Sequence, residues 1–302
     1  MSAQASAAKA IPKRKRPNPS MGWIPYLFVL PNLLIFTTFI VIPMITGFVY
    51  SFHEYDGLNP MEFVGMDNYK ELFTNGEFWT ALGKTALYAL IVVPLIYCLS
   101  LAVAMMLIQP LKWKGLFRSV FYWPTMISYI IVGLTWKWIF GDFGVLNYFL
   151  TLFGIEPVHF LSDSFFANGS VIIATAWSRL GFYMVIFMAG LQAIPTDFYE
   201  AARLDGASKL RVFRSITLPL LKPTTVLVIM LSLIEAVKAY PLLFALTGGG
   251  PGKETTYVVQ YIYETGFAKQ ELGMASAMSV LLFILISLFT ALQFRLSKGG
   301  AD

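Results

Sequence analysis

Charged residues are scarce in this sequence. Asp, Glu, Lys and Arg make up only 13% of its 302 residues, whereas hydrophobic residues make up 57% and the mean hydropathy is +0.66. A soluble globular domain carries about 25% charged residues. The composition therefore excludes an ordinary soluble domain and indicates a polytopic membrane protein.

Residue types used in thiol, metal and catalytic chemistry are scarce too. Cys98 is the single cysteine and lies in an apolar run, so the chain forms no internal disulfide. The two histidines, His53 and His159, are far apart and not at metal-ligand spacing. The sequence contains no nucleotide-binding fingerprint, no nucleophile–base arrangement and no repeat of fixed period. We expect no catalytic residue, metal or cofactor in this chain, and no nucleic-acid partner.

Six apolar segments are each long enough to cross a bilayer, which takes about 20 helical residues. The first is too long for the apolar core of a cleaved signal peptide. We expect a basic disordered tail at 1–22, a membrane domain at 23–294 and a short tail at 295–302. The six predicted spans are 23–50, 85–108, 119–140, 171–194, 223–246 and 272–294.

Lys and Arg are distributed unequally between the connections. The N-terminal tail holds five, loop 109–118 three, loop 195–222 five and the C-terminus two, giving 15 on one side of the membrane. The opposite loops hold four: Lys70, Lys84, Lys253 and Lys269. Because basic loops stay in the cytoplasm, we expect both termini and loop 195–222 to be cytoplasmic.

The most polar internal stretch is the connector at 195–222. Pro195 is suited to opening a helix, and Gly206 is suited to ending it. A second helix is expected from about Ser208, and Pro219 and Pro223 break the chain before the next span. We predict a helix–turn–helix element, whose small residues suit insertion into a groove of another protein. An ordinary amphipathic connector is the alternative.

The same stretch resembles the cytoplasmic coupling loop of membrane subunits of ABC importers. The pattern is Glu200-Ala201-Ala202, three residues, Gly206, nine residues, Ile216, one residue, Leu218-Pro219. The resemblance implies that the helix at 197–209 docks onto a separate ATPase subunit. The residues it assigns to ATPase coupling are Glu200, Ala201, Ala202, Arg203, Asp205, Gly206, Leu218 and Pro219.

The resemblance also implies an all-α fold like that of type I ABC importer permeases, in a bacterial or archaeal cytoplasmic membrane. Its expected partners are a second homologous permease, two ATPase subunits that bind ATP and Mg²⁺, an extracytoplasmic sugar-binding protein and membrane lipid. The extra N-terminal helices and long outer insertion of the larger maltose-type permease are absent, so maltose itself is not supported as the substrate.

Three outer loops carry further predictions. Loop 51–84 is expected to hold a short surface helix, and 144–153 an interfacial helix. The stretch 248–255 looks like a phosphate-binding loop, but Thr247 replaces the required glycine and Glu254 the Ser or Thr that reaches magnesium. Together with residues 273–277, this stretch instead resembles the corresponding sequence of sugar-transporting members of the permease family.

Four charged residues fall at membrane depth, where charge is expensive unless it is paired or faces a cavity. Lys137 lies between two tryptophans and is explained by snorkelling. Arg179 either lines a pathway or forms a structural pair, and Glu235 and Lys238 either pair with each other or contact substrate. The predicted substrate pathway comprises Arg179, Tyr183, Glu235, Lys238 and Tyr240.

Two other classes of protein stay open. An ion-coupled secondary transporter would use Glu235 as its coupling carboxylate, and the coupling-loop pattern disfavours it. A polytopic membrane enzyme would need a catalytic constellation near one membrane face, and the sequence contains none.

Overall fold

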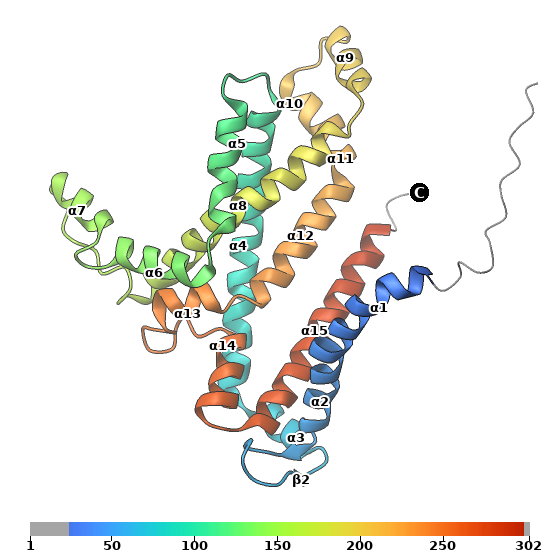
Figure 1. The fold of residues 1–302 in the computed structure, drawn as a ribbon. Coiled ribbons are helices and arrows are strands. Elements are labelled where there is room, and N and C mark those ends of the chain that lie inside the picture. The colour runs from blue at the N-terminus through green and yellow to red at the C-terminus, as the bar shows by residue number, and fades with distance from the viewer. Residues whose placement is uncertain (1–23, 299–302) are drawn as a thin grey trace, which may run out of the picture. The chain divides into compact units, whose positions relative to one another are not determined.

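The computed structural model describes residues 24–298 (Figure 1). The predicted tail at 1–22 and the last four residues lie outside the described part. The chain divides into two compact units, Met1–Val49 and Tyr50–Asp302, which we describe separately.

The described part of the first unit is helical, and its helix runs on to the first residue of the second unit. It consists of α1 (Ile24–Phe36), the π-helical turn η2 (Thr37–Val41) and α2 (Ile42–Tyr50). Proline lacks the backbone N–H that an α-helix needs and its ring clashes with the preceding turn, and the wider π turn just before Pro43 relieves that clash. The segment Tyr26–Tyr50 is long and apolar enough to cross a membrane, as predicted.

The second unit contains a small antiparallel pair of strands, in which His53 is opposite Phe63, and otherwise helices. In chain order its elements are β1 (His53–Glu54), β2 (Glu62–Phe63), α3 (Asp67–Thr74), α4 (Gly76–Ile108), α5 (Lys114–Tyr122), η3 (Trp123–Met126), α6 (Tyr129–Phe140), α7 (Val145–Leu152), α8 (Ser164–Gln192), α9 (Thr196–Leu204), α10 (Lys209–Val212), η4 (Phe213–Thr217), α11 (Leu218–Leu220), α12 (Lys222–Val237), α13 (Pro241–Thr247), α14 (Val258–Tyr263), η5 (Glu264–Ala268) and α15 (Leu272–Lys298).

The main core joins α4, α6, α8, α12 and α13. Val92 of α4, Met184 and Phe187 of α8 and Leu243 of α13 are fully or almost fully buried in it. Helices approach most closely where a side chain is missing. A Cβ at Gly181 of α8 would collide with the backbone carbonyl of Phe121 in α5. Gly181 therefore sets how closely α8 packs against α5.

A second apolar cluster joins α3, α14, the first turns of α4 and the start of α15. Leu72, Phe78 and Met278 are fully buried there, and Tyr261 is 5% exposed. Figure 1 shows α9 and α10 at one end of the second unit and α3 with β2 at the other. We call the end that carries α3 the distal end.

Four predicted spans differ from the observed helices. The span at 171–194 begins earlier, because the Asp163 side chain caps α8 at Ser164. The span at 85–108 begins earlier, because the Asn75 side chain accepts a hydrogen bond from Phe78 N and caps α4 at Gly76. The span at 119–140 is broken after α5, where Pro124 introduces a 3₁₀ turn. The span at 223–246 is broken at 238–240, before Pro241. Trp123 before Pro124 keeps the α conformation, and the chain leaves the helix only at Ile127 and Ser128, whose ψ angles are 140° and 137°. The residue before a proline is disfavoured in the α conformation, and Tyr240 before Pro241 has left it, with φ −139° and ψ −57°.

The number of membrane spans agrees with the prediction when broken helices are counted together. Among the described residues, five helices are long and apolar enough to cross a membrane. The count rises to six if Lys209–Leu220 and Lys222–Val237, which meet at 69°, form one span. The short helices expected within 51–84 and at 144–153 are also present, as α3 and α7, and their outer position stays a prediction.

Candidate coupling and translocation sites

The connector at 195–222, which we call the coupling segment, forms the predicted helix–turn–helix element. Pro195 precedes α9, and Gly206 follows it with φ +68°. Ala207 N donates to Ala202 O at 2.9 Å and Gly206 N to Arg203 O at 3.1 Å. This is the pattern of a Schellman helix end, and it requires the positive φ that glycine adopts without strain.

One side of α9 packs on the next helices while the other is open. Ala202 is 8% exposed, and the Tyr199 hydroxyl lies 3.2 Å from Thr217 Oγ1. On the open side, Phe198 is 49% and Leu204 is 89% exposed. Apolar side chains so exposed at the tip of a polar element are typical of a contact surface.

The residues predicted for ATPase coupling divide into two sets. Leu218 packs against the main core, and Ala202 is buried on the packed side of α9, so both hold the segment in place. The other six are exposed: Glu200, Ala201, Arg203, Asp205, Gly206 and Pro219.

All five residues predicted for the substrate pathway line one cavity of about 70 Å³ between α4, α6, α8 and the break that follows α12. Irregular backbone at membrane depth is tolerated where it lines a cavity. The break at 238–240 meets this condition, since Lys238, Ala239 and Tyr240 all face the cavity. The five residues are Arg179, Tyr183, Glu235, Lys238 and Tyr240.

The ion pair in this cavity joins different residues from those expected. Glu235 pairs with Arg179 of α8, and not with its helix neighbour Lys238. The guanidinium of Arg179 also lies 4.3 Å from the ring centre of Tyr129, at the start of α6. Arg179 therefore ties α6, α8 and α12 together. Among the described residues Lys238 forms no ion pair, so the cavity lining has one surplus positive charge.

Hydroxyl groups supply the remaining polarity of the cavity. Tyr183 is 1% exposed, and its hydroxyl has no hydrogen-bond partner among the described residues. Ser178 and Ser232 donate to carbonyls of their own helices, which leaves their oxygens able to accept. A ligand that both donates and accepts hydrogen bonds would match these groups.

Sequence reasoning missed several cavity residues. Tyr129 lies at the start of α6, and Val92 and Ile96 lie on α4. Thr175 lies one turn before Arg179 on α8, and that spacing was the signal that could have found it, whereas Ser178 directly precedes Arg179. The neighbouring Trp177 packs edge-on against Trp136 and is not among the residues that line the cavity.

Comparison with known proteins decides the family. Residues 97–299 match the protein family described as the binding-protein-dependent transport system inner membrane component. The chain belongs to this family. This permease is therefore a multi-pass protein of the cytoplasmic membrane and a transport component, not an enzyme.

Several relatives are similar over nearly their whole length. The permease is 34% identical over 279 residues to the trehalose/maltose transport system permease protein MalF of Thermococcus litoralis, covering 92% of this chain and 94% of that protein. It is 35% identical to the multiple sugar-binding transport system permease protein MsmF of Streptococcus mutans, covering 94% and 98%. The sn-glycerol-3-phosphate transport system permease protein UgpA of Pectobacterium atrosepticum is 31% identical, with 93% and 96% covered.

A solved structure has the same fold as the permease. A chain of a bacterial ABC transporter that imports the acidic polysaccharide alginate superposes with a TM-score of 0.82 at 22% identity, covering 94% of this chain and 98% of that one. The predicted all-α fold of an ABC importer permease is thus confirmed.

Proposed function

We propose that this permease is the membrane subunit of an ATP-driven sugar importer, and that its coupling segment docks onto a separate ATPase. The observation that carries the proposal is α9, a helix that projects exposed apolar side chains beyond a packed base. Binding of ATP and Mg²⁺ to an ATPase dimer would displace α9. A ligand shifts a conformational equilibrium only if it binds the two states with unequal affinity. The ATP-bound ATPase must therefore bind the inward- and outward-facing states of the permease unequally.

The cavity supports a role in the substrate pathway and the need for a second permease. Its volume of about 70 Å³ is far below the about 300–1,000 Å³ of sites that enclose a ligand. We infer that this chain supplies one wall, with Arg179, Tyr183, Glu235, Lys238 and Tyr240 facing the substrate, and that a homologous subunit supplies the other.

Sugars are the substrate class we assign. The names of the relatives refer to trehalose, maltose, multiple sugars and glycerol 3-phosphate, which are all rich in hydroxyl groups. Hydroxyl-rich ligands suit the free hydroxyl of Tyr183 and the accepting oxygens of Ser178 and Ser232. An extracytoplasmic binding protein would deliver the sugar, as in the solved complex of the alginate transporter with its pentasaccharide-bound periplasmic protein.

The two rival functions are not favoured. An ion-coupled transporter would need Glu235 to exchange protons or sodium, but this carboxylate is already paired with Arg179. An enzyme would need a catalytic group, and the family is one of transport components.

The proposal is tested by co-purification of the ATPase. Glu200→Lys reverses an exposed charge on α9 and is expected to abolish ATPase binding while membrane insertion stays normal. Glu71→Lys is the matched control, because Glu71 is also an exposed carboxylate on a helix, in α3 at the distal end. A Glu200→Lys variant that retains the ATPase at normal yield would refute the docking assignment. Uptake that survives ATP depletion and stops with an uncoupler would instead favour the ion-coupled transporter.

A further inference from the structure

The break at 238–240 separates α12, which continues from the coupling segment, from α13. A movement of the coupling segment must therefore cross this break to reach α13. Nothing in the helix backbone itself makes the two sides of a break move together, because the continuous hydrogen-bond ladder ends there. A displacement of α12 therefore reaches α13 only if other contacts hold α13 in register with the bundle.

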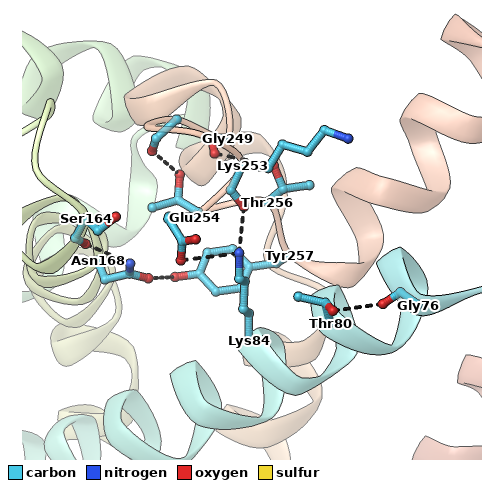
Figure 2. Close-up of polar contacts among 12 residues, drawn as sticks. Gly76, Thr80, Lys84, Ser164, Asn168, Gly249, Lys253, Glu254, Thr256 and Tyr257 are labelled. Carbon is cyan, nitrogen blue, oxygen red and sulfur yellow. Dashed lines mark hydrogen bonds and ion pairs between the residues drawn. The ribbon is translucent and has the colours of Figure 1, made fainter.

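The connection at 248–257, which we call the distal loop, supplies such contacts on the far side of α13. It joins α13 to α14. Lys84 of α4 donates to the carbonyl oxygen of Lys253 at 3.0 Å, and its Nζ lies 3.3 Å from a carboxylate oxygen of Glu254. Figure 2 shows Lys84 reaching from its helix to both groups.

In a second ion pair the lysine belongs to the distal loop and the carboxylate to α4. Lys253 of the distal loop lies 2.9 Å from Glu77 of α4, and this hydrogen bond raises the pKa of the Lys253 ammonium above its usual range. The side chains of Lys253 and Glu77 are 65% and 56% exposed, whereas the side chain of Lys84 is only 24% exposed. Since exposed ion pairs contribute little, Lys84 is expected to contribute more than Lys253.

Buried contacts continue the connection beneath Lys84. Val258 N donates to Thr85 Oγ1 at 2.9 Å. The Tyr257 hydroxyl donates to Asn168 Oδ1 of α8 at 2.9 Å, as Figure 2 shows. The rings of Tyr88 and Tyr257 lie 4.9 Å apart. The distal loop is thus tied to both α4 and α8.

The distal loop is also closed on itself, so it transmits displacement rather than absorbing it. Thr255 Oγ1 lies 2.7 Å from both Thr247 Oγ1 and Gly250 O. Gly249 has φ +92°, and a Cβ there would collide with Thr256 and Gln260. Such packing leaves the loop little freedom, despite its run of glycines.

From these contacts we propose that Lys84 is a positioning residue that fixes the distal loop, and through it α13, to α4 and α8. The two sides of the break then move as one body when the coupling segment is displaced. The proposal rests on the proposed coupling function, since it concerns how motion that begins at α9 reaches the distal end.

Spin labels test this proposal without knowledge of the substrate. Labels are placed at Leu210→Cys in α10 and Phe244→Cys in α13, both exposed positions, in a Cys98→Ser background that removes the only native cysteine. Distances between the labels are measured in the complex with the second permease and the ATPase, without nucleotide and with ATP and vanadate. We expect a narrow distribution that is unchanged by ATP and vanadate, because the two sides of the break move as one body.

Lys84→Met is expected to broaden the distribution and to make it shift on addition of ATP and vanadate, because α13 no longer follows α12. The rate of ATP hydrolysis is expected to stay within about twofold, since a change in the coupling between sites need not change a catalytic rate. The charge swap Lys84→Glu with Glu254→Lys restores the ion pair but not the bond to the carbonyl, so partial recovery is expected. Lys70→Met is the matched control. It removes an exposed Lys70–Asp67 pair, with side chains 76% and 67% exposed, within α3 at the same end.

The outcomes separate the two proposals. A Lys84→Met complex that keeps the narrow, unchanged distribution of the unaltered complex would overturn the positioning role alone. An unaltered complex whose distribution shifts with ATP and vanadate would also overturn it, because the two sides of the break would then not move as one body. An unaltered complex that binds no ATPase would overturn the coupling function and this inference with it. Equal effects of Lys70→Met and Lys84→Met would overturn the inference, because of these two lysines only Lys84 contacts the distal loop.

Discussion

Arg179 of α8 donates to the carboxylate of Glu235 on α12, joining two helices through residues 56 positions apart. The side chains are 21% and 44% exposed, so both charges are partly withdrawn from solvent and adjoin the cavity. The pair therefore links the helix that leaves the coupling segment to a helix of the main core.

Arg179→Gln is expected to destabilise the permease by about 1–3 kcal/mol, because it leaves the Glu235 carboxylate partly buried without its partner. The charge swap Arg179→Glu with Glu235→Arg is expected to recover only part of this, since the contact of Arg179 with Tyr129 is lost. Thermal unfolding in detergent measures the effect. Lys137→Gln, which removes an exposed cation of α6, is the control, and an equal loss there would refute the pairing argument.

Tyr183→Phe is expected to leave stability unchanged and to slow uptake of the sugar delivered by the binding protein. The hydroxyl it removes is buried and has no partner among the described residues, so the folded permease loses no hydrogen bond. Tyr257→Phe is the matched comparison. It removes a hydroxyl that donates to Asn168 and should cost about 1 kcal/mol of stability. Normal uptake by Tyr183→Phe would exclude this hydroxyl from the pathway.

Gly181→Ala is expected to be destabilising by about 1–3 kcal/mol, as overpacking usually is. The added methyl would meet the backbone of α5, which has no rotamer to move away. Gly169→Ala lies on the same helix with nothing within 4 Å of the new Cβ, and is expected to be neutral or stabilising by up to about 1 kcal/mol. Similar unfolding temperatures for the two variants would contradict the assigned contact.

Asp56 is expected to make the stability of its turn depend on pH in acid. Its carboxylate accepts hydrogen bonds from Asn59 N at 2.8 Å and Leu58 N at 2.9 Å, and these bonds lower its pKa below the ordinary value of 3.8. A lowered pKa stabilises the folded turn above pH 3.8, and this contribution is lost as the pH falls through the folded value. Infrared titration of the carboxyl band, with Asp56→Asn as the blank, measures the pKa. A midpoint above 3.8 would show that the turn does not hold the carboxylate.

Much of the coupling segment could be predicted because its determinants are local. Proline before α9, glycine after it and Ser208 before α10 act through backbone geometry within a few residues. The polar residues of the pathway were found for a similar reason, since charge within an apolar run is conspicuous whatever the fold. Their role in transport stays a proposal.

The partners of those residues could not be predicted. Glu235 and Lys238 are helix neighbours, and their spacing suggested a pair, yet the carboxylate binds Arg179 instead. Helix periodicity reports only neighbours on one helix, whereas packing brings α8 against α12. The predicted continuous spans at 119–140 and 223–246 were wrong for a related reason, because hydropathy averages over a proline break.

The sequence alone determined that the chain enters a membrane, how many times it can cross, and where a polar helix–turn–helix element interrupts its apolar segments. These properties depend on composition and short-range backbone preferences, which tertiary contacts do not reverse. Only the tertiary structure decided that Arg179 meets Glu235, that five dispersed side chains line one cavity, and that Lys84 holds a loop 169 positions further along the chain. Such pairings depend on how the helices pack, and each is fixed by many weak contacts that no local pattern encodes.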